Sequence, residues 1–345
     1  MLPMNRHPFL AVLAAVAVAS AAATGGAEAA SGRDGGTLTV YSGRTEELVG
    51  PLLEQFAADT DIEVKVRYGD SADLALLIDE EGDRSPADVF LSQSPGATGY
   101  LDGRERLQPI ANSVLARVER RFRAGDGRWV GVSGRVRVLA YNTDLVEEKD
   151  LPESVLDLTK PKYRGRVGVA PTNGSFQDFV TAMRELEGEK RTERWLRGMA
   201  ANDARTYANN LAIVAAVGRG EIPMGLVNHY YASIAKEADP DLPVANHVFP
   251  NRDVGSVILV TAAAVLKSTD HRPQAEQFVR FLLSRFAQNH LSADEFEYPL
   301  ARGVEPPAGL PPLSTVDAPT LDLDDLGGGL ARTRELIAQS GLEQA

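Results

Sequence analysis

Short runs of apolar and β-branched residues alternate with longer segments of helical periodicity from residue 37 onward. Side chains alternate between two faces in a strand, whereas apolar residues three and four positions apart form one face of a helix. The first part of the chain therefore predicts a βαβαβ arrangement. Thr45 and Ser71 are the expected N-caps of its two helices. In order, its segments read TLTVYSG, TEELVGPLLEQFAADT, DIEVKVRYG, SADLALLIDEEG and PADVFLSQS.

The same alternation continues through the rest of the chain. Further strands are predicted at RVRVLAYNTD (135–144), GRVGVAPT, IPMGLV and VGSVILVTAAAVL. Further helices are predicted from Ser175, at RTERWLRGMAA, at NNLAIVAAVGRG, after Tyr231 and at PQAEQFVRFLLSRFAQ. A chain of this length and order is expected to fold as two α/β lobes. Ligands of such folds bind in the crevice where strand carboxyl ends meet helix N-termini, so polar residues at these points become candidates.

The N-terminus predicts export from the cytoplasm. MLPMNRHP is followed by the apolar run FLAVLAAVAVASAAA, which is short for a membrane span, and Ala27 and Ala29 fit a small-x-small cleavage pattern. Residues 1–29 are therefore interpreted as a signal peptide, with no membrane span expected in the mature chain. Because the sequence contains no cysteine, neither disulfides nor a lipid-anchored cysteine is expected.

The net charge excludes some partners. The formal net charge is −12, and loss of residues 1–29 removes Arg6 and Glu28, one charge of each sign, so the mature chain keeps this value. An acidic chain argues against nucleic acid and anionic membrane surfaces as partners. A local basic pocket can still hold a small anion, and we expect a monomer.

The most informative candidates are two adjacent tyrosines, Tyr230 and Tyr231, at a predicted strand-to-helix junction. Neighbouring side chains point to opposite faces of a strand, but at a helix start they are only about 100° apart and can converge on one partner. The residues alone leave the alternative open that one ring belongs to the core and the other to an interface. Arg44, Gln93 and the TNGS loop stand at other predicted strand ends.

Several motifs in a fixed order resemble the periplasmic ferric-ion-binding proteins of bacterial ABC iron-uptake systems. They are LTVYSGR, EEGDRSPADVFLSQ, SGRVRVLAYNTD, APTNGSFQD, NHYY, AAAVLKS and EYPL, and they cover nearly the whole mature chain. The resemblance implies an α/β type II periplasmic binding protein with two lobes, each a mixed sheet flanked by helices, and a two-strand hinge. It places residues 30–137 plus 262–312 in the first lobe and 138–261 plus 313–345 in the second.

The resemblance also implies that Tyr230 and Tyr231 bind Fe(III) in the cleft. Fe(III) favours anionic oxygen, and a tyrosine with an ordinary pKa of about 10 becomes a phenolate when it coordinates such a cation. The chain departs from the family pattern, however, because Thr45 and Gln93 stand where many members have a histidine and a glutamate ligand. Asn173 and Phe176 stand in a loop where some relatives have a further tyrosine.

The missing ligands predict a synergistic anion, carbonate or phosphate. TNGS opens a helix whose free N–H groups favour an anion. By resemblance, the anion-binding residues are Asn173, Gly174, Ser175, Asn210 and Asn228, joined by Arg44, with Gln93 and Arg135 as further candidates. The two arginines also have an alternative interpretation as surface or interlobe salt bridges. His229 is a candidate supporting residue beside the tyrosines.

Three functions follow from these patterns. The first is a ferric-ion carrier that serves an inner-membrane ABC permease. The second is a binding protein for another small anion, such as a phosphonate or sulfate, whose tyrosines only cover the site. The third is a secreted hydrolase or transferase, but the sequence has no G-x-S-x-G, P-loop, G-x-G-x-x-G or H-E-x-x-H motif. We therefore expect a protein that is not an enzyme.

Overall fold

The computed structural model describes residues 36–306 and 310–344. The predicted signal peptide, residues 1–29, lies outside this part of the chain. Within it, no helix combines the length and the apolar character that crossing a membrane requires.

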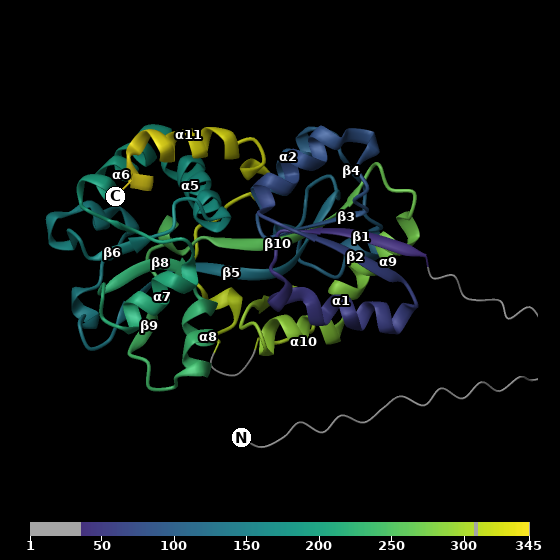
Figure 1. Ribbon diagram of the computed structural model, residues 1–345. Coiled ribbons are helices and arrows are strands. Elements are labelled where there is room, and N and C mark those ends of the chain that lie inside the picture. The colour runs from purple at the N-terminus through teal and green to yellow at the C-terminus, as the bar shows by residue number, and fades with distance from the viewer. Residues whose placement is uncertain (1–35, 307–309, 345) are drawn as a thin grey trace, which may run out of the picture. The chain divides into compact units, whose positions relative to one another are not determined.

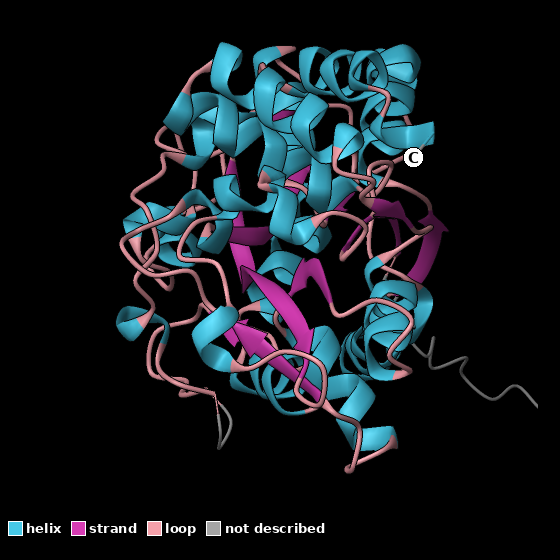
Figure 2. Ribbon diagram, turned by 90° about the vertical axis from the view of Figure 1, so that its left-hand side faces the viewer, coloured by secondary structure: helices cyan, strands magenta, loops and turns pink. Residues whose placement is uncertain are grey.

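Eleven strands of the described residues form one mixed sheet, in the order β2-β1-β3-β10-β5-β8-β6-β7, with β4, β9 and β11 paired at its side. Helices lie on either side of the strands (Figure 2), as the alternation along the sequence predicts. The strands are β1 (Thr37–Ser42), β2 (Glu63–Tyr68), β3 (Val89–Ser92), β4 (Leu107–Gln108), β5 (Trp129–Asn142), β6 (Val167–Val169), β7 (Arg205–Thr206), β8 (Met224–Asn228), β9 (Val244–His247), β10 (Ile258–Leu266) and β11 (Tyr298–Pro299).

Most of the helices fall where apolar residues recur at helical spacing. The pattern is clearest in α9 and α10, where the buried positions Ala275, Phe278, Val279 and Leu282 and then Ala287 and Leu291 lie three and four apart. The helices are α1 (Glu46–Thr60), α2 (Ser71–Glu81), α3 (Pro95–Gly103), α4 (Asn112–Leu115), α5 (Gly174–Glu187), α6 (Glu189–Ala201), α7 (Asn210–Gly218), α8 (Tyr230–Ala238), α9 (Arg272–Leu282), α10 (Arg285–Ala293) and α11 (Leu330–Ser340).

The long strand β5 connects two groups of strands. Its first part, Trp129–Val136, pairs with β10, and its last part, Arg137–Asn142, pairs with β8 and β9. We call β1–β4, β10 and β11 the first strand group and β6–β9 the second strand group. In Figure 1, β5 and β10 extend from the side that carries β6 and β8 to the side that carries β1 and β2. The two-strand hinge that the resemblance implies would run through RVRVLAYN (135–142) and VGSVILVTA (254–262), which overlap β5 and β10.

Parallel pairing within each group places helix starts at one edge of the sheet. In the first group β1 pairs in parallel with β2 and β3, and in the second group β6 pairs in parallel with β7 and β8. The helices α1, α5 and α8 therefore begin just after the carboxyl ends of β1, β6 and β8. This is the crevice geometry in which α/β sheets bind ligands.

One of the two predicted helix caps is confirmed and the other is displaced by one residue. Thr45 is the N-cap of α1, as predicted, although its side chain makes no capping hydrogen bond. Ser71 is the first residue of α2 rather than its cap, because the Asp70 carboxylate accepts the bond from Ala72 N at 2.8 Å. Aspartate one position earlier offers the same capping chemistry, so the sequence pattern could not separate the two.

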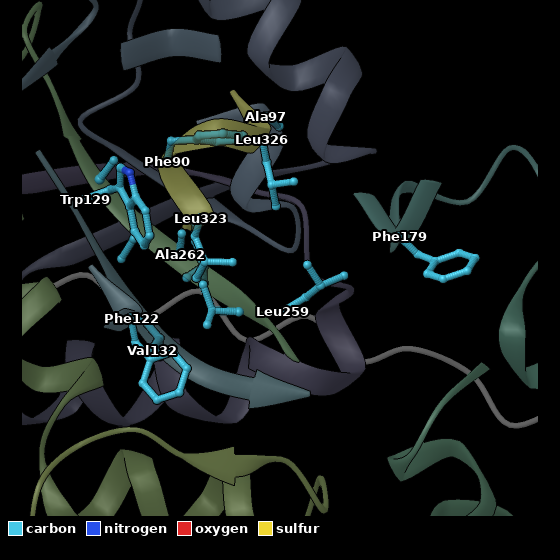
Figure 3. Packing of buried hydrophobic residues seen from close by; sticks show 14 of the residues in the cluster. Phe90, Ala97, Phe122, Trp129, Val132, Phe179, Leu259, Ala262, Leu323 and Leu326 are labelled. Carbon is cyan, nitrogen blue, oxygen red and sulfur yellow. The ribbon is translucent and has the colours of Figure 1, made fainter. Parts of the chain in front are cut away.

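The hydrophobic core is shared between the strand groups. One large cluster includes Val89 and Trp129 near the first group and Phe176 on α5 near the second. A smaller cluster around Val138, Ile213 and Val217 fills the space beneath α7. The C-terminal part also contributes, since Leu323 and Leu326 pack beside residues such as Ala97 (Figure 3), and α11 contacts α5 and α6.

Candidate metal and anion site

The paired tyrosines lie at the first turn of α8, directly after β8. Their ring centroids are 4.3 Å apart with planes tilted by 34°, so the adjacent side chains face each other instead of pointing to opposite sides. Tyr230 is fully buried and Tyr231 is partly buried. The strand-to-helix junction thus produces the convergence that the sequence predicts for these positions.

The hydroxyl of Tyr230 receives hydrogen bonds from both strand groups. Gln93 Nε2, from the loop after β3, donates at 3.4 Å, and Asn228 Nδ2, at the end of β8, donates at the same distance. The backbone carbonyl of Gln93 accepts a hydrogen bond from the guanidinium of Arg135 on β5. Thr45, the second position where the chain departs from the family pattern, is exposed at the start of α1. Gln93 is therefore the candidate from the first group that contacts a phenol.

The predicted anion-binding residues come together at the N-terminus of α5. Asn173 caps this helix, because its Oδ1 accepts from Ser175 N at 3.1 Å and from Ser175 Oγ at 2.6 Å. Asn210 Nδ2 donates to Asn173 Oδ1 at 3.2 Å, and Asn228 Nδ2 donates to Ser175 Oγ at 3.3 Å. Gly174 is the first residue of the helix. The loop, the start of α7 and the end of β8 thus form one polar cluster beside Tyr230.

Arg137 also belongs to this cluster, although the sequence analysis did not single it out. Its Nη1 donates to the amide oxygens of Asn210 and Asn228, both at 3.3 Å, and its Nη2 donates to Leu226 O at 2.8 Å. Burial, and then the nearby charge of Arg135, lower the pKa of Arg137 to about 9, so it remains a cation at neutral pH. The sequence carried a signal for Arg137, because alternate residues of a strand share a face and Arg135, two positions earlier, was already a candidate.

Arg44 and Arg135 are held by acidic residues that the sequence analysis also missed. Arg44 Nη1 lies 2.6 Å from Glu297 Oε1 and donates to Thr261 Oγ1 at 3.3 Å. Arg135 Nη2 lies 3.8 Å from Asp178 Oδ2 on α5. Both pairs are buried, so neither arginine forms a surface salt bridge. The alternative of an interlobe salt bridge stays open for Arg135, because Asp178 lies on α5. Both acids lie within motifs that carry the resemblance, EYPL and APTNGSFQD, but neither motif indicates a charge partner.

The three buried arginines retain N–H groups without a partner. Among the described residues, Arg44 Nε and Nη2, Arg135 Nε and Nη1, and Arg137 Nε are buried and lack a hydrogen-bond acceptor. A buried donor without an acceptor is strongly unfavourable, and charged donors are the most expensive to leave unpaired. The arrangement therefore has the chemistry of a site that receives an anion.

Tyr231 is protonated in the absence of a cation. Burial, and then the neighbouring Tyr230, raise the pKa of Tyr231, whereas the charge of Arg44 acts in the opposite direction. A metal ion that binds Tyr231 must therefore displace its proton. The part of the chain that the structure describes contains no cluster of three or more His, Cys, Asp or Glu side chains suited to a metal, so the phenols are the metal-binding candidates.

The fold and these residues define a solute-binding protein whose candidate site contains three buried arginines with free N–H groups. A family described as bacterial extracellular solute-binding protein matches residues 84–326, and the chain belongs to this family. It is 33% identical to the Fe(3+)-binding periplasmic protein of Serratia marcescens over 320 residues, which cover 92% of this chain and 93% of that protein. It is 35% identical to the major ferric iron-binding protein of Neisseria meningitidis over 310 residues, 89% of this chain and 93% of that one.

Solved structures of iron-bound proteins are also similar to this chain. Iron-bound HitA from Pseudomonas aeruginosa has a TM-score of 0.85 and 38% sequence identity, and the match covers 89% of this chain and 99% of HitA. FutA from Trichodesmium in complex with iron and citrate has a TM-score of 0.76 and 27% identity, with 89% and 99% coverage. The predicted fold class and the resemblance to ferric-binding proteins are confirmed. The family consists of binding proteins, which also confirms that the chain is not an enzyme.

Proposed function

We propose that the protein captures Fe(III) in the periplasm and delivers it to an inner-membrane ABC permease. The observation that carries the proposal is the phenol pair, with ring centroids 4.3 Å apart, in a chain whose relatives are named as ferric iron-binding proteins. Two phenolates on one helix turn supply the hard anionic oxygens that Fe(III) prefers. The partial positive charge at the start of α8 also stabilises the phenolates.

The proposal includes two lobes that close around the iron. The first lobe comprises residues 30–137 plus 262–312 and the second comprises 138–261 plus 313–345, and β5 and β10 cross between them. In this division the Gln93–Tyr230 hydrogen bond joins a loop of the first lobe to a phenol of the second, which is a contact that a closed form would make. Binding would then shift an equilibrium between open and closed forms of a monomer.

A bound anion completes the iron site in this proposal. The three guanidinium charges and the three charges of Fe(III) exceed the three negative charges of two phenolates and Glu297 by three. Asp178 and Glu295, whose pKa values burial raises to about 7, offset at most two of these. A dianion such as carbonate or hydrogen phosphate, or a tricarboxylate such as citrate, would balance the remainder. The polar cluster at α5 and the free N–H groups of Arg44, Arg135 and Arg137 would bind it.

One observation favours a second candidate function, the binding of a phosphonate or sulfate without iron. The unpartnered N–H groups of the three arginines suit an anion whether or not a metal is present. In that case the tyrosines only cover the anion.

Titration with Fe(III) in the presence of carbonate or phosphate separates the two candidates. The iron carrier develops a visible phenolate-to-iron charge-transfer band and yields iron in elemental analysis of protein purified from the periplasm without chelators. A protein that binds each anion equally well with and without iron, and stays colourless, would instead support the second candidate.

A further inference from the structure

His229 occupies the point where β5 changes partners. Val136 on β5 pairs with Ile258 of β10, and the next residue, Arg137, pairs with Asn228 of β8. His229 follows Asn228 and satisfies both backbone groups of Val136. Its N–H donates to Val136 O at 3.0 Å, and its Nδ1 accepts from Val136 N at 3.2 Å. A side chain thus takes the place of a backbone acceptor at the crossing between the two strand groups.

The imidazole ring also contacts two aromatic rings, Tyr298 on β11 and Tyr230 on α8. It stacks on Tyr298 of β11, with centroids 4.9 Å apart and planes tilted by 29°. It meets the Tyr230 ring edge to face, at 5.7 Å and 86°. Because β11 pairs with β5 at Gly134, the ring joins the first strand group to the phenol pair. Edge-to-face and offset-stacked contacts are the geometries that aromatic rings prefer.

The hydrogen bond to Nδ1 determines the tautomer of the imidazole. Since Nδ1 accepts a hydrogen bond from a backbone N–H, the neutral ring carries its proton on Nε2. The ring is therefore a fixed acceptor, and its backbone is held as well, because Asn246 Nδ2 donates to His229 O at 2.7 Å.

We propose that His229 is a positioning residue that sets the ring orientation of Tyr230 relative to β5 and β11, and so links closure of the lobes to the geometry of the phenol pair. The inference rests on the proposed iron-binding function and deepens it. Rotation about β5 changes the position of Val136 and Tyr298 relative to α8. The imidazole contacts both and also the Tyr230 ring, so it transmits that change directly to a phenol. Supporting contacts of this kind orient metal ligands in other sites.

Two substitutions separate the roles of the hydrogen bond and the ring. His229→Asn keeps an acceptor near the position of Nδ1 but removes the aromatic contacts, whereas His229→Phe keeps a ring but leaves Val136 N without its acceptor. Tyr298→Leu removes the stacking partner without changing His229 itself. His290→Asn is the matched control, because His290 pairs with Asp294 on α10, away from the tyrosines.

The readouts are the position of the phenolate-to-iron band, the rate of iron release to a chelator and the midpoint of thermal unfolding. We expect His229→Asn and Tyr298→Leu to shift the band and to weaken iron binding by about 10- to 100-fold, the range typical of lost supporting contacts. His229→Phe should be the least stable variant, and the control should match the wild type.

The outcomes are distinguishable. An unchanged band and release rate in folded His229→Asn and Tyr298→Leu would overturn this inference while leaving the proposed function intact. Wild-type protein that develops no band with Fe(III) would overturn the proposed function and this inference with it. If His229→Phe does not fold, the other two variants still decide the question, because neither removes the acceptor for Val136 N.

Discussion

Arg44 Nη1 and Glu297 Oε1 lie 2.6 Å apart with both side chains about 1% exposed. The contact joins the loop after β1 to the segment just before β11, and the second carboxylate oxygen of Glu297 accepts a hydrogen bond from Ser133 on β5. Burial alone would lower the pKa of Arg44, but the charge of Glu297 and then the two phenols raise it. Arg44 is therefore a fixed cation that belongs to the first strand group and faces the tyrosines of the second.

Removal of one member of this pair should destabilise the protein. Glu297→Gln leaves Arg44 buried without its counter-charge, and losing one partner of a buried pair typically costs about 3–5 kcal/mol. The free energy of unfolding in urea measures the effect. The exposed pair Glu147–Lys149 has the same 2.6 Å separation, so Glu147→Gln is a matched control and should change stability by less than about 1 kcal/mol. Equal, small effects of both substitutions would show that the buried pair contributes little.

Loss of either phenol should remove most of the iron colour. Tyr230→Phe and Tyr231→Phe keep the ring and hence most of the packing, but each removes one of only two phenolate ligands. Iron affinity should fall by more than the about 10- to 100-fold expected for a lost supporting contact. Visible absorbance and a chelator competition titration measure both effects. Tyr163→Phe is the control, since its hydroxyl donates to Asp150 O away from the site. A variant that keeps the full band identifies its tyrosine as packing alone.

Burial of the Asp178 carboxyl should make stability depend on pH. Ser94 Oγ, from the first strand group, donates to Asp178 Oδ1 at 2.6 Å, and burial raises the pKa of this carboxyl to about 7. An aspartate in the unfolded chain has a pKa of about 4. The folded state thus holds a proton that the unfolded state has lost, and stability from this group is full below about pH 4 and is lost as pH rises through about 7.

Asp178→Asn tests this dependence. The wild-type free energy of unfolding should fall relative to the variant between pH 5 and pH 8, by an amount on the order of a few kcal/mol. Glu295, with a pKa also raised to about 7 by burial, contributes in the same direction, so Glu295→Gln should reduce the slope separately. Parallel stability curves for wild type and Asp178→Asn would mean that Arg135, 3.8 Å away, keeps Asp178 ionised throughout.

The sequence predicted the elements and the phenol pair because both depend on local rules. Periodicity predicts the strand at 135–144, which is the later part of β5, and the strand region of β10, but it misses the start of β5 at Trp129–Gly134. Helix geometry explains why Tyr230 and Tyr231 can converge. The charge partners depend instead on chain segments far apart in the sequence. Neither the Arg44–Glu297 contact nor the Asp178–Ser94 contact could be read from a local pattern, because only the folded sheet brings these residues together.

Arg137 shows the same limit at the anion site. Strand alternation places Arg137 on the same face as Arg135, but its partners become visible only when Asn210 and Asn228 are placed around its guanidinium. The loop at Asn173, by contrast, carries its own signal, because capping chemistry is local.

Iron affinity should depend steeply on a multivalent anion, and Arg137 should carry much of that dependence. In anion-depleted buffer the phenols and Gln93 cannot fill the coordination shell, and the unpartnered N–H groups of the three arginines repel the metal. Carbonate, phosphate or citrate should restore tight binding, while chloride should not, because a monovalent ion neither balances the charge nor accepts bonds from several donors. A competition titration against a chelator, repeated in each buffer, measures the dependence.

Two variants define the part that Arg137 plays. Arg137→Gln removes the charge between Asn210 and Asn228 and should abolish most of the gain from added anion, whereas Arg137→Lys keeps the charge but loses the forked geometry and should retain part of it. Binding should also weaken on acidification, since protons compete for the phenolates and the anion. Equal wild-type affinity in all buffers would contradict the anion site and would mean that a further protein group, with Gln93 the nearest candidate by its contact to Tyr230, completes the shell.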